Sequence, residues 1–470
     1  MSLGSALSLN MINMIGVGPF ITLPLVVAAM GGPQAMLGWI LGALIALCDG
    51  LVWSELGAAL PRAGGSYAFL KEIYGSEKAG RWISFLYIWQ LGFSAPLSIA
   101  SGCIGLAQYA AYLWPQLNRP INSGAKLSGW HPSIPLTSLV AAATCVTVTL
   151  LLYRNVRTVM KMGWVLWGGV VFTLGAVIFA GFTHFHPALA FTLPPHALSL
   201  SPAFFEGLGA AMLFTTYDYW GYYNVTFLGG EVRDPGRNIP RAVMLSIVLV
   251  GALYLLLSVS VLGVLPWQEL TAAVKTQGHF AVVAVVMQRT MGAVAGRIVA
   301  GLVMWTAFAS VFALLMAYSR VPFAAARDGN YFRMFGRLHP RHGFPHISLL
   351  ALGAAATLFC FFDLSHVITA LVAIRILLQF VLQQAGVILL RMRQPKLARP
   401  FRIWLYPLPP LLAMAGFLFM LFSRTDAVRE LRYAAAIALS GSVIYFARAF
   451  LQREWPFPNQ HAPKTPSRGA

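Results

Sequence analysis

Charged residues are scarce in this 470-residue chain, at 10% of the total, whereas ordinary soluble domains carry about 25%. Acidic residues are the scarcer kind, 14 in all, and the four cysteines all fall in apolar segments. The histidines, cysteines and acids are scattered, so neither a metal-ligand cluster nor a nucleophile–base pair is evident, and there is no glycine-rich phosphate loop. The scarcity of charged residues excludes an ordinary soluble globular protein. The lack of these site motifs predicts that the chain is not an enzyme and needs no cofactor.

Apolar sequence is what the chain has in abundance, with 58% hydrophobic residues. Stretches of about 20 apolar residues, the length needed to cross a bilayer, recur along it. No cleavable signal peptide is expected, because a charged segment before the first apolar run is missing. We expect an all-α integral membrane protein with 12 transmembrane helices, near residues 7–30, 34–60, 82–114, 134–153, 162–182, 203–230, 242–265, 297–320, 346–362, 364–390, 404–422 and 433–451.

The net charge of +19 is placed mainly on one side of these predicted helices. If the N-terminus is cytoplasmic, 24 of the 33 lysines and arginines fall in cytoplasmic loops or the C-terminal tail. This bias is the positive-inside pattern of membrane proteins. It predicts a multi-pass protein of the cell (inner) membrane with both termini cytoplasmic, whose basic charge faces anionic lipid and does not bind nucleic acid.

The first predicted span is interrupted at Gly16–Phe20, which reads Gly-Val-Gly-Pro-Phe between two apolar runs. Proline lacks a backbone donor and glycine is costly to hold in a helix, so the helix is expected to break there. Unpaired backbone groups cost several kcal/mol in hydrocarbon, and a break survives where it lines a cavity or is buried in protein. The break therefore predicts a binding site made of backbone, and the alternative is a simple proline kink.

The sixth predicted span carries a polar and aromatic segment at Thr215–Asn224, and we expect its helix to be broken near residues 215–221. Asp218 lies at its centre, and an acid at mid-membrane depth costs about 2.5–3.5 kcal/mol or more, which usually marks a transport pathway or a paired partner. Interruptions five spans apart are the layout of a five-plus-five inverted repeat with discontinuous helices. We expect repeats over residues 1–182 and 203–391, two more helices over 404–451 and a disordered cytoplasmic tail at 452–470.

Three motifs in order are similar to those of the amino acid–polyamine–organocation (APC) superfamily of transporters. The first is Trp53–Tyr67, the second Gly230–Pro235 with Asn238–Ala242, and the third Ser319–Gly329. The resemblance runs over most of the chain. It implies the leucine-transporter-like fold of two inverted five-helix repeats plus two extra helices.

The resemblance also implies a secondary transporter that moves an amino acid by alternating access, coupled to protons or by exchange. In amino-acid members, free amides at the helix-one break hold the substrate carboxylate and carbonyls near the helix-six break hold its amine; a half-helix N-terminus suits an anion. The corresponding substrate-binding residues are Ile15, Gly16, Val17, Gly18, Thr215, Thr216, Tyr217, Asp218 and Tyr219. The implied partners are a small amino acid or amine, protons and membrane lipid, with no obligate protein partner.

The first break departs from the usual Gly-Ser-Gly-Ile-Phe of amino-acid members. Val17 removes a hydroxyl and Pro19 removes an amide donor, and the Gly-Pro-Phe string resembles the polyamine-transporting branch. A polyamine or cationic amine is therefore the alternative substrate, for which Asp218 would bind an ammonium group or carry a proton. An alternative of another class is a sensor or accessory subunit that has the transporter fold but does not transport.

The remaining ionisable residues in predicted spans are candidates for coupling or gating. A single charged side chain inside the membrane is costly in free energy, so we expect Asp49 and Arg375 either to pair with each other or to have separate polar partners. Alternatively, Arg375 could face an aqueous vestibule and contact a carboxylate. Glu55 is expected to pair with loop arginines at the cytoplasmic end, and Glu231 is a similar candidate, although both could be solvated loop charges. Trp220, beside Asp218, is a candidate gate or cation-binding ring.

Overall fold

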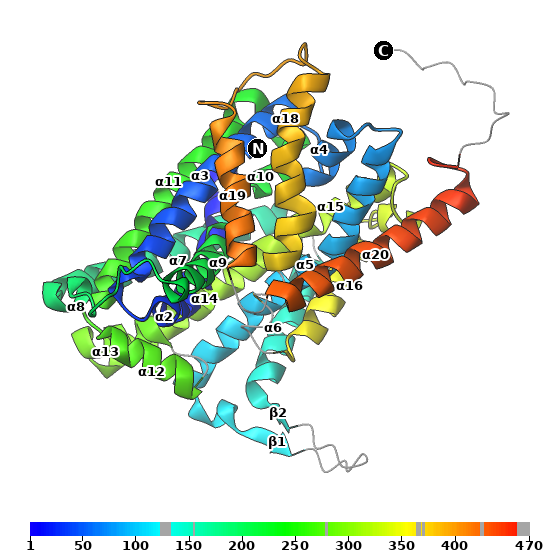
Figure 1. The fold of residues 1–470 in the computed structure, drawn as a ribbon. Helices are drawn as coiled ribbons and strands as arrows, with labels where there is room; N and C mark the ends of the chain where they lie inside the picture. The colour runs from blue at the N-terminus through cyan, green and yellow to red at the C-terminus, as the bar shows by residue number, and fades with distance from the viewer. Residues whose placement is uncertain are drawn as a thin grey trace.

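The computed structural model describes residues 1–122, 133–153, 156–277, 281–362, 368, 372–423 and 427–457. Apart from a two-stranded hairpin, the regular structure of these residues is helical (Figure 1). The strands are β1 (Pro120–Asn122) and β2 (Ser133–Pro135), antiparallel with Ile121 opposite Ile134. The helices are α1 (Leu3–Ile15), α2 (Gly18–Met30), α3 (Met36–Ala59), α4 (Ser66–Ile73), α5 (Ala79–Leu113), α6 (Leu136–Leu152), α7 (Val156–Thr183), α8 (Pro187–Phe191), α9 (Pro202–Tyr219), α10 (Asn224–Phe227), α11 (Pro235–Leu262), α12 (Trp267–Gln277), α13 (Val282–Met291), α14 (Ala293–Tyr318), α15 (Arg320–Arg327), α16 (His346–Phe359), α18 (Leu382–Arg393), α19 (Leu408–Phe422) and α20 (Ala427–Gln452).

Seven helical segments in the described part are long and apolar enough to cross a membrane, and the bent pair α1–α2 makes an eighth. The seven segments are 33–59, 79–113, 165–183, 235–262, 293–327, 372–393 and 427–452. Shorter apolar helices, α6, α13, α16 and α19, lie among them. This composition makes the chain a multi-pass membrane protein. The predicted tail at 452–470 lies outside the described residues from position 458 onward.

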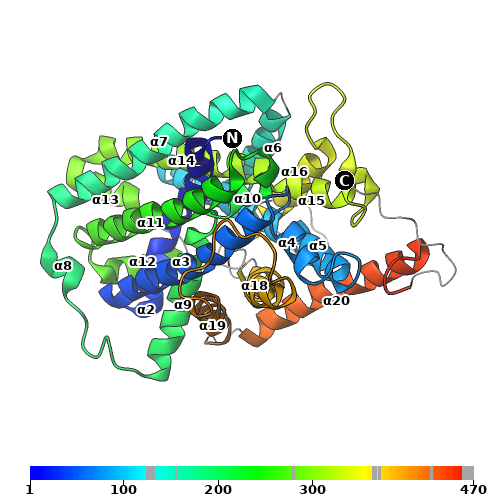
Figure 2. The same cartoon turned by 90° about the horizontal axis from the view of Figure 1, so that it is seen from above.

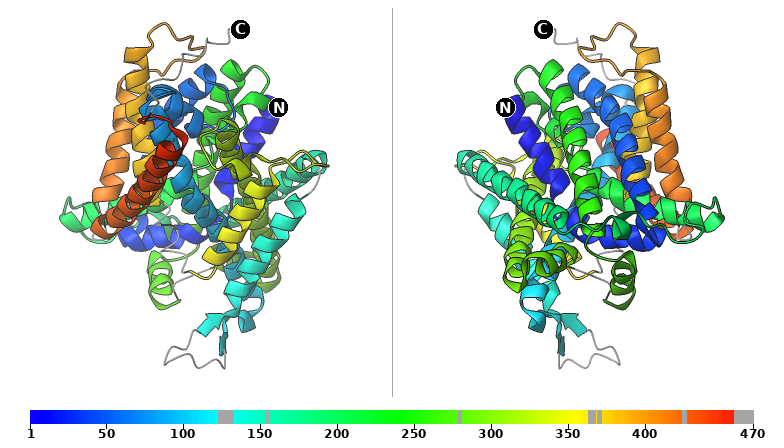
Figure 3. Two further views of the ribbon diagram at one scale, coloured as in Figure 1. Left: turned by 90° about the vertical axis from the view of Figure 1, so that its right-hand side faces the viewer. Right: turned by 90° about the vertical axis from the view of Figure 1, so that its left-hand side faces the viewer.

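The bundle has two distinct ends (Figures 1 and 3). The N-terminus and α4 lie at one end, while the β1–β2 hairpin, α12 and α13 lie at the other. Seen from above, α20 runs along the outer edge of the bundle and α1 lies inside it, next to α14 and α10 (Figure 2). Both breaks described below are therefore surrounded by other helices.

Buried apolar side chains form one cluster that runs through most of the bundle. In α1 the residues from Leu9 to Ile15 are all buried, and α1 packs on α11 and α14, while α2 packs on α9. Across the bundle, α5 packs on α14, α6 and α16. A helix surrounded by protein on every side can leave backbone groups unpaired only beside polar partners or a cavity. The interior position of α1 thus sets where a binding site can form.

Candidate functional site

The first predicted break is present, and it is short. Helix α1 ends at Ile15, α2 begins at Gly18, and the two axes differ by 44°. Gly16 has φ 38° and ψ −148°, a conformation open mainly to glycine. Pro19 does not break a helix, because it lies in the first turn of α2, where its missing N–H is no loss. The amides of Val17 and Gly18 donate no hydrogen bond to any described residue.

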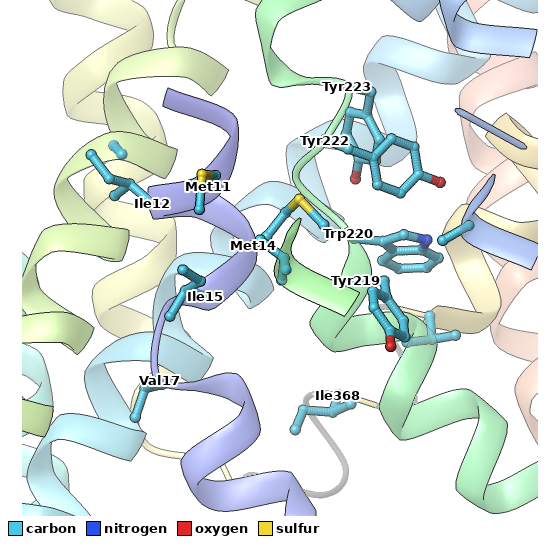
Figure 4. Packing of buried hydrophobic residues seen from close by; sticks show 14 of the residues in the cluster. Met11, Ile12, Met14, Ile15, Val17, Tyr219, Trp220, Tyr222, Tyr223 and Ile368 are labelled. Carbon is cyan, nitrogen blue, oxygen red and sulfur yellow. The ribbon is translucent and has the colours of Figure 1, made fainter. Parts of the chain in front are cut away.

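The second break lies at residues 220–223, so it overlaps only the end of the break predicted near residues 215–221 and extends beyond it. Thr215–Tyr219 stay helical as the last turns of α9, and α10 begins at Asn224. Trp220 is extended, and Gly221 takes φ 130°. A Cβ at Gly221 would lie 2.8 Å from the backbone nitrogen of Met14, so glycine lets the second break approach α1 closely. In Figure 4, Met14 points from α1 toward the segment that carries Trp220 and Tyr222.

Two polar side chains tie the breaks together. Asn10 of α1 donates from Nδ2 to the carbonyl of Tyr222 (2.5 Å) and accepts from the amide of Val225 (3.0 Å). The Tyr254 hydroxyl from α11 lies 2.5 Å from the carbonyl of Met14 and 3.2 Å from that of Asp218. These bonds satisfy backbone groups that the breaks leave open, and they hold the two discontinuous helices at a fixed distance.

A cavity of about 40 Å³ lies between the two breaks. Such a volume has room for roughly three water molecules. Helices α5 and α14 close two of its sides, and Arg375 closes another. The residues that line it are Asn13, Met14, Gly16, Val17, Gly18, Ser98, Gly102, Tyr217, Asp218, Trp220, Gly221, Ser310, Leu314, Tyr318 and Arg375.

Several polar atoms on this lining are buried and have no hydrogen-bond partner among the residues that the structure describes. They are both amide atoms of Asn13, Oδ1 of Asp218, Nε1 of Trp220 and Nε of Arg375. Buried polar groups without a partner are rare in native proteins, and each calls for a water, ion or ligand. Their concentration in one small cavity marks it as a place for a polar molecule.

Asp218 lies beside the start of α2. Its Oδ2 accepts a hydrogen bond from the Thr22 hydroxyl, which lies one turn into α2, and Oδ1 accepts none from any described residue. The carboxyl group is so close to Gly18 that a Cβ at that position would overlap it. Asp218 is 2% exposed, so the protein surrounds its carboxyl group almost entirely.

Arg375 is also 2% exposed, and its hydrogen-bond partners are neutral oxygens. Nη1 donates to the Tyr223 hydroxyl (3.2 Å), and Nη2 lies near the Tyr318 hydroxyl (2.9 Å) and the Ser98 hydroxyl (3.0 Å). The guanidinium carbon lies 5.5 Å from the centre of the Trp220 ring. These contacts hold the side chain at the edge of the cavity.

The structure brings about half of the predicted binding residues to the cavity. Gly16, Val17, Gly18, Tyr217 and Asp218 line it, as do the gating candidates Trp220 and Arg375. Four predicted residues do not: Ile15 is packed in the core, and the side chains of Thr215, Thr216 and Tyr219 point to the carbonyl of Gly38, the sulfur of Met420 and the carbonyl of Trp39. Because Thr215–Tyr219 remain helical, only one face of this segment meets the cavity.

The alternative of an Asp49–Arg375 pair is wrong, and each has separate polar partners instead. Asp49 accepts hydrogen bonds from the Trp53 indole (2.9 Å), the Tyr222 hydroxyl and the Gln384 amide, which join α3, the second break and α18. Asp49 does not line the cavity. Its three neutral donors satisfy the buried carboxyl where it stands, so no arginine is required.

Glu55 and Glu231 lie at the end of the bundle that carries the N-terminus. Glu55 is buried and contacts Arg391 at 2.9 Å, Arg399 at 3.3 Å and the amide of Ile403 at 2.8 Å. The Glu231 carboxylate is exposed and lies 3.5 Å from Arg320. Neither lines the cavity.

Sequence reasoning missed several lining residues, of which Asn13 and Ser98 are the most polar. The sequence pattern could have identified Asn13 as a candidate, because Asn10 and Asn13 carry amide side chains three positions apart in an apolar helix and share a face. Ser310 and Tyr318 are also missed, and they stand two helical turns apart on α14. Nothing in the sequence separates Ser98 from the other small residues of α5.

Comparison with known proteins confirms the resemblance to the APC superfamily. The family model described as "Amino acid permease" matches residues 2–443. The chain is 26% identical to the serine/threonine exchanger SteT of Bacillus subtilis, over 94% of each chain. It is 27% identical to the aspartate-proton symporter of the same species (80% of this chain, 70% of the relative) and 26% identical to human Asc-type amino acid transporter 1 (95% and 81%). The chain belongs to the amino acid permease family of the APC superfamily.

Proposed function

We propose that this protein is a secondary transporter that carries an amino acid across the cell membrane by alternating access. The observation that carries the proposal is the cavity between the two breaks, with its unpaired polar atoms from Asn13, Asp218, Trp220 and Arg375. The relatives reported above are named as an exchanger, a symporter and a transporter of amino acids. A site made of broken helices inside a bundle is the arrangement that such transport needs.

The proposed topology has 12 transmembrane helices, ten of them in two inverted repeats over residues 1–182 and 203–391. Two observations support it. The breaks fall in the first and sixth predicted spans, and each predicted span overlaps a described helix or helix pair. The helices at 404–451, α19 and α20, pack at the edge of the bundle, which suits an addition to the repeats. We place both termini in the cytoplasm from the distribution of lysine and arginine.

The proposed substrate site consists of the backbone at Gly16–Gly18, the side chains of Tyr217 and Asp218, and the residues of α5 and α14 that close the cavity. Tyr217 is held against the cavity by a hydrogen bond of 2.7 Å between its hydroxyl and that of Ser101. Trp220 lies stacked on Phe380, with ring centres 4.8 Å apart, and would move as a gate between states.

We propose that Asp218 is the residue that couples substrate transport to proton movement or to exchange, because it is the acidic side chain that lines the cavity. A carboxyl group there can change its protonation when the cavity opens to either side. An accessory subunit or sensor with no transport activity remains the contrasting outcome of the experiment below. The polyamine alternative is not favoured by the relatives, which are named for amino acids.

The experiment is a ligand panel followed by uptake. Purified protein is screened by thermal shift with the twenty amino acids and with putrescine and spermidine, and the stabilising compounds are tested as radiolabelled substrates in proteoliposomes, with a pH gradient and in counterflow. Accumulation of at least one amino acid supports the proposal. Binding without accumulation in either format would point to a sensor, and accumulation of amines alone would point to the cationic alternative.

A further inference from the structure

Arg375 carries a positive charge that is buried at the cavity and has no counter-charge among the described residues. It is 2% exposed, and arginine stays protonated in proteins. Nη1 and Nη2 donate to the hydroxyls of Tyr223, Tyr318 and Ser98 and to the carbonyl of Ser94, which are all neutral. No carboxylate in the described part of the chain lies within 4.0 Å of the guanidinium. Neutral hydrogen bonds offset only part of the cost of burying a charge, so an anion beside Arg375 would stabilise it.

Asp218, the acidic residue on the same cavity, does not supply that anion in this arrangement. Its Oδ2 accepts a hydrogen bond from the Thr22 hydroxyl, and its carboxyl group lies beside Gly18 at the start of α2. No ion pair joins it to Arg375. The charge of Arg375 is therefore unanswered whether or not the Asp218 carboxyl is protonated.

The wall of the cavity at Arg375 is rich in hydrogen-bond donors. Nε of Arg375 is buried and donates to no described residue. The hydroxyls of Ser98 and Tyr318 accept from Arg375, and no described acceptor takes their own hydrogen atoms. All three residues line the cavity. N–H and O–H donors without acceptors, placed around a fixed positive charge, are the ligands that a small anion requires.

Packing holds this positive charge in place. The guanidinium carbon lies 5.5 Å from the centre of the Trp220 ring and 5.2 Å from that of the Tyr318 ring. Trp220 stacks on Phe380, which belongs to a π-helical turn, Ile376–Val381, that starts directly after Arg375. Such turns are rare and occur frequently at functional sites. The cation at the cavity wall is thus preformed, and a ligand need not order it.

We propose that a small inorganic anion, chloride, binds in the cavity against Arg375, with the hydroxyls of Ser98 and Tyr318 as further ligands. A cavity of about 40 Å³ has room for a few water molecules, and hence for one chloride ion. Water is the competing occupant, but a neutral molecule does not answer the charge of the guanidinium. The anion site goes beyond the proposed function, because it fills without an amino acid.

The test measures the thermal stability of purified protein in dodecyl maltoside while chloride replaces gluconate at constant ionic strength, with no amino acid present. Gluconate is too large for the cavity and serves as the reference anion. The wild type is compared with Arg375→Gln, Ser98→Ala and Tyr318→Phe. Arg289→Gln is the matched control, because Arg289 pairs with Glu269 and its side chain is 44% exposed. Crystals of the wild type grown in bromide give a second readout that needs no variant, since bromide scatters X-rays anomalously.

The unfolding temperature of the wild type should rise with chloride and level off, as binding at one site requires. Ser98→Ala and Tyr318→Phe should each weaken chloride affinity about tenfold, the loss expected for one hydrogen bond to a charged group. Arg375→Gln should abolish the saturable rise, whereas Arg289→Gln should retain it. The bromide crystals should show an anomalous peak in contact with Arg375.

Wild-type stability that does not depend on chloride would overturn the inference, even if every variant misfolds. Bromide crystals without an anomalous peak at Arg375 would do the same, because water alone would then occupy this wall. An undiminished chloride effect in folded Arg375→Gln would also contradict the site, since the anion would then bind elsewhere. None of these results bears on the proposed function, which fails only if no amino acid is bound or transported.

Discussion

The cluster around Glu55 offers a stability prediction that can be worked out from burial. Glu55 is 1% exposed, Arg399 is 7% exposed and Arg391 is 21% exposed. Arg391 contacts both carboxylate oxygens, and the amide of Ile403 donates to Oε2. Glu55→Ala would leave two arginines close together, one of them deeply buried, and a backbone amide without an acceptor.

Breaking a buried ion pair by removing one partner costs about 3–5 kcal/mol. Because Arg391 is partly exposed and water can reach it, we take the lower end, about 3 kcal/mol, which is roughly a hundredfold in the unfolding equilibrium. The assay is equilibrium unfolding of the purified protein in mixed SDS and dodecyl maltoside micelles. Glu55→Gln, which keeps two hydrogen-bonding atoms and loses the charge, should fall between the wild type and Glu55→Ala.

Glu231 supplies the matched control for Glu55. It also pairs with an arginine, Arg320, but its carboxylate is 60% exposed and the contact is 3.5 Å. Glu231→Ala should cost less than about 1 kcal/mol, as exposed pairs do. Equal effects of Glu55→Ala and Glu231→Ala would refute the argument from burial. So would additivity of Glu55→Ala and Arg391→Ala, because residues in contact should show a coupling energy.

Three further predictions concern the two breaks. Gly18→Ala places a Cβ where the Asp218 carboxyl stands, and it should weaken substrate binding roughly tenfold in isothermal titration. The control Gly4→Ala, which has open space around the new Cβ, should leave binding unchanged. Tyr254→Phe removes the donor to the carbonyl of Met14 and should destabilise the protein by about 1–3 kcal/mol in micelle unfolding; a change below 0.5 kcal/mol would contradict its bridging role. Asp218→Asn should make uptake at saturating substrate independent of pH between 5 and 8, and a retained pH profile would remove Asp218 from coupling.

The sequence predicted the location of the breaks because glycine, proline and a mid-span acid carry strong local signals. Gly16–Gly18 and Asp218 all reach the cavity. The extent of the second break was harder to predict, since Thr215–Tyr219 are compatible with either a helix or a break. The structure keeps them helical, because Thr215 and Tyr219 hydrogen-bond to carbonyls of the neighbouring α3 segment, and it leaves the interruption to Gly221.

Contacts between distant helices could not be predicted from one sequence. Asp49 and Arg375 look like partners because each is costly alone in a span. Their actual neighbours, Gln384 and Tyr222 for the acid and Tyr223 and Tyr318 for the base, are neutral residues whose proximity depends on helix packing. Neutral donors and acceptors give no periodic or charge signal in the sequence.

Counterflow of a radiolabelled amino acid into proteoliposomes is the decisive test for a substrate site at the first break, with wild-type protein, Gly18→Ala and Gly4→Ala reconstituted side by side. Unlabelled amino acid inside the vesicles should drive uptake of the labelled compound through the wild type and Gly4→Ala. Gly18→Ala should be strongly impaired at substrate concentrations below saturation. Counterflow that is absent from the wild type for all twenty amino acids, or equal in Gly18→Ala and Gly4→Ala, would contradict a binding site at the break between α1 and α2.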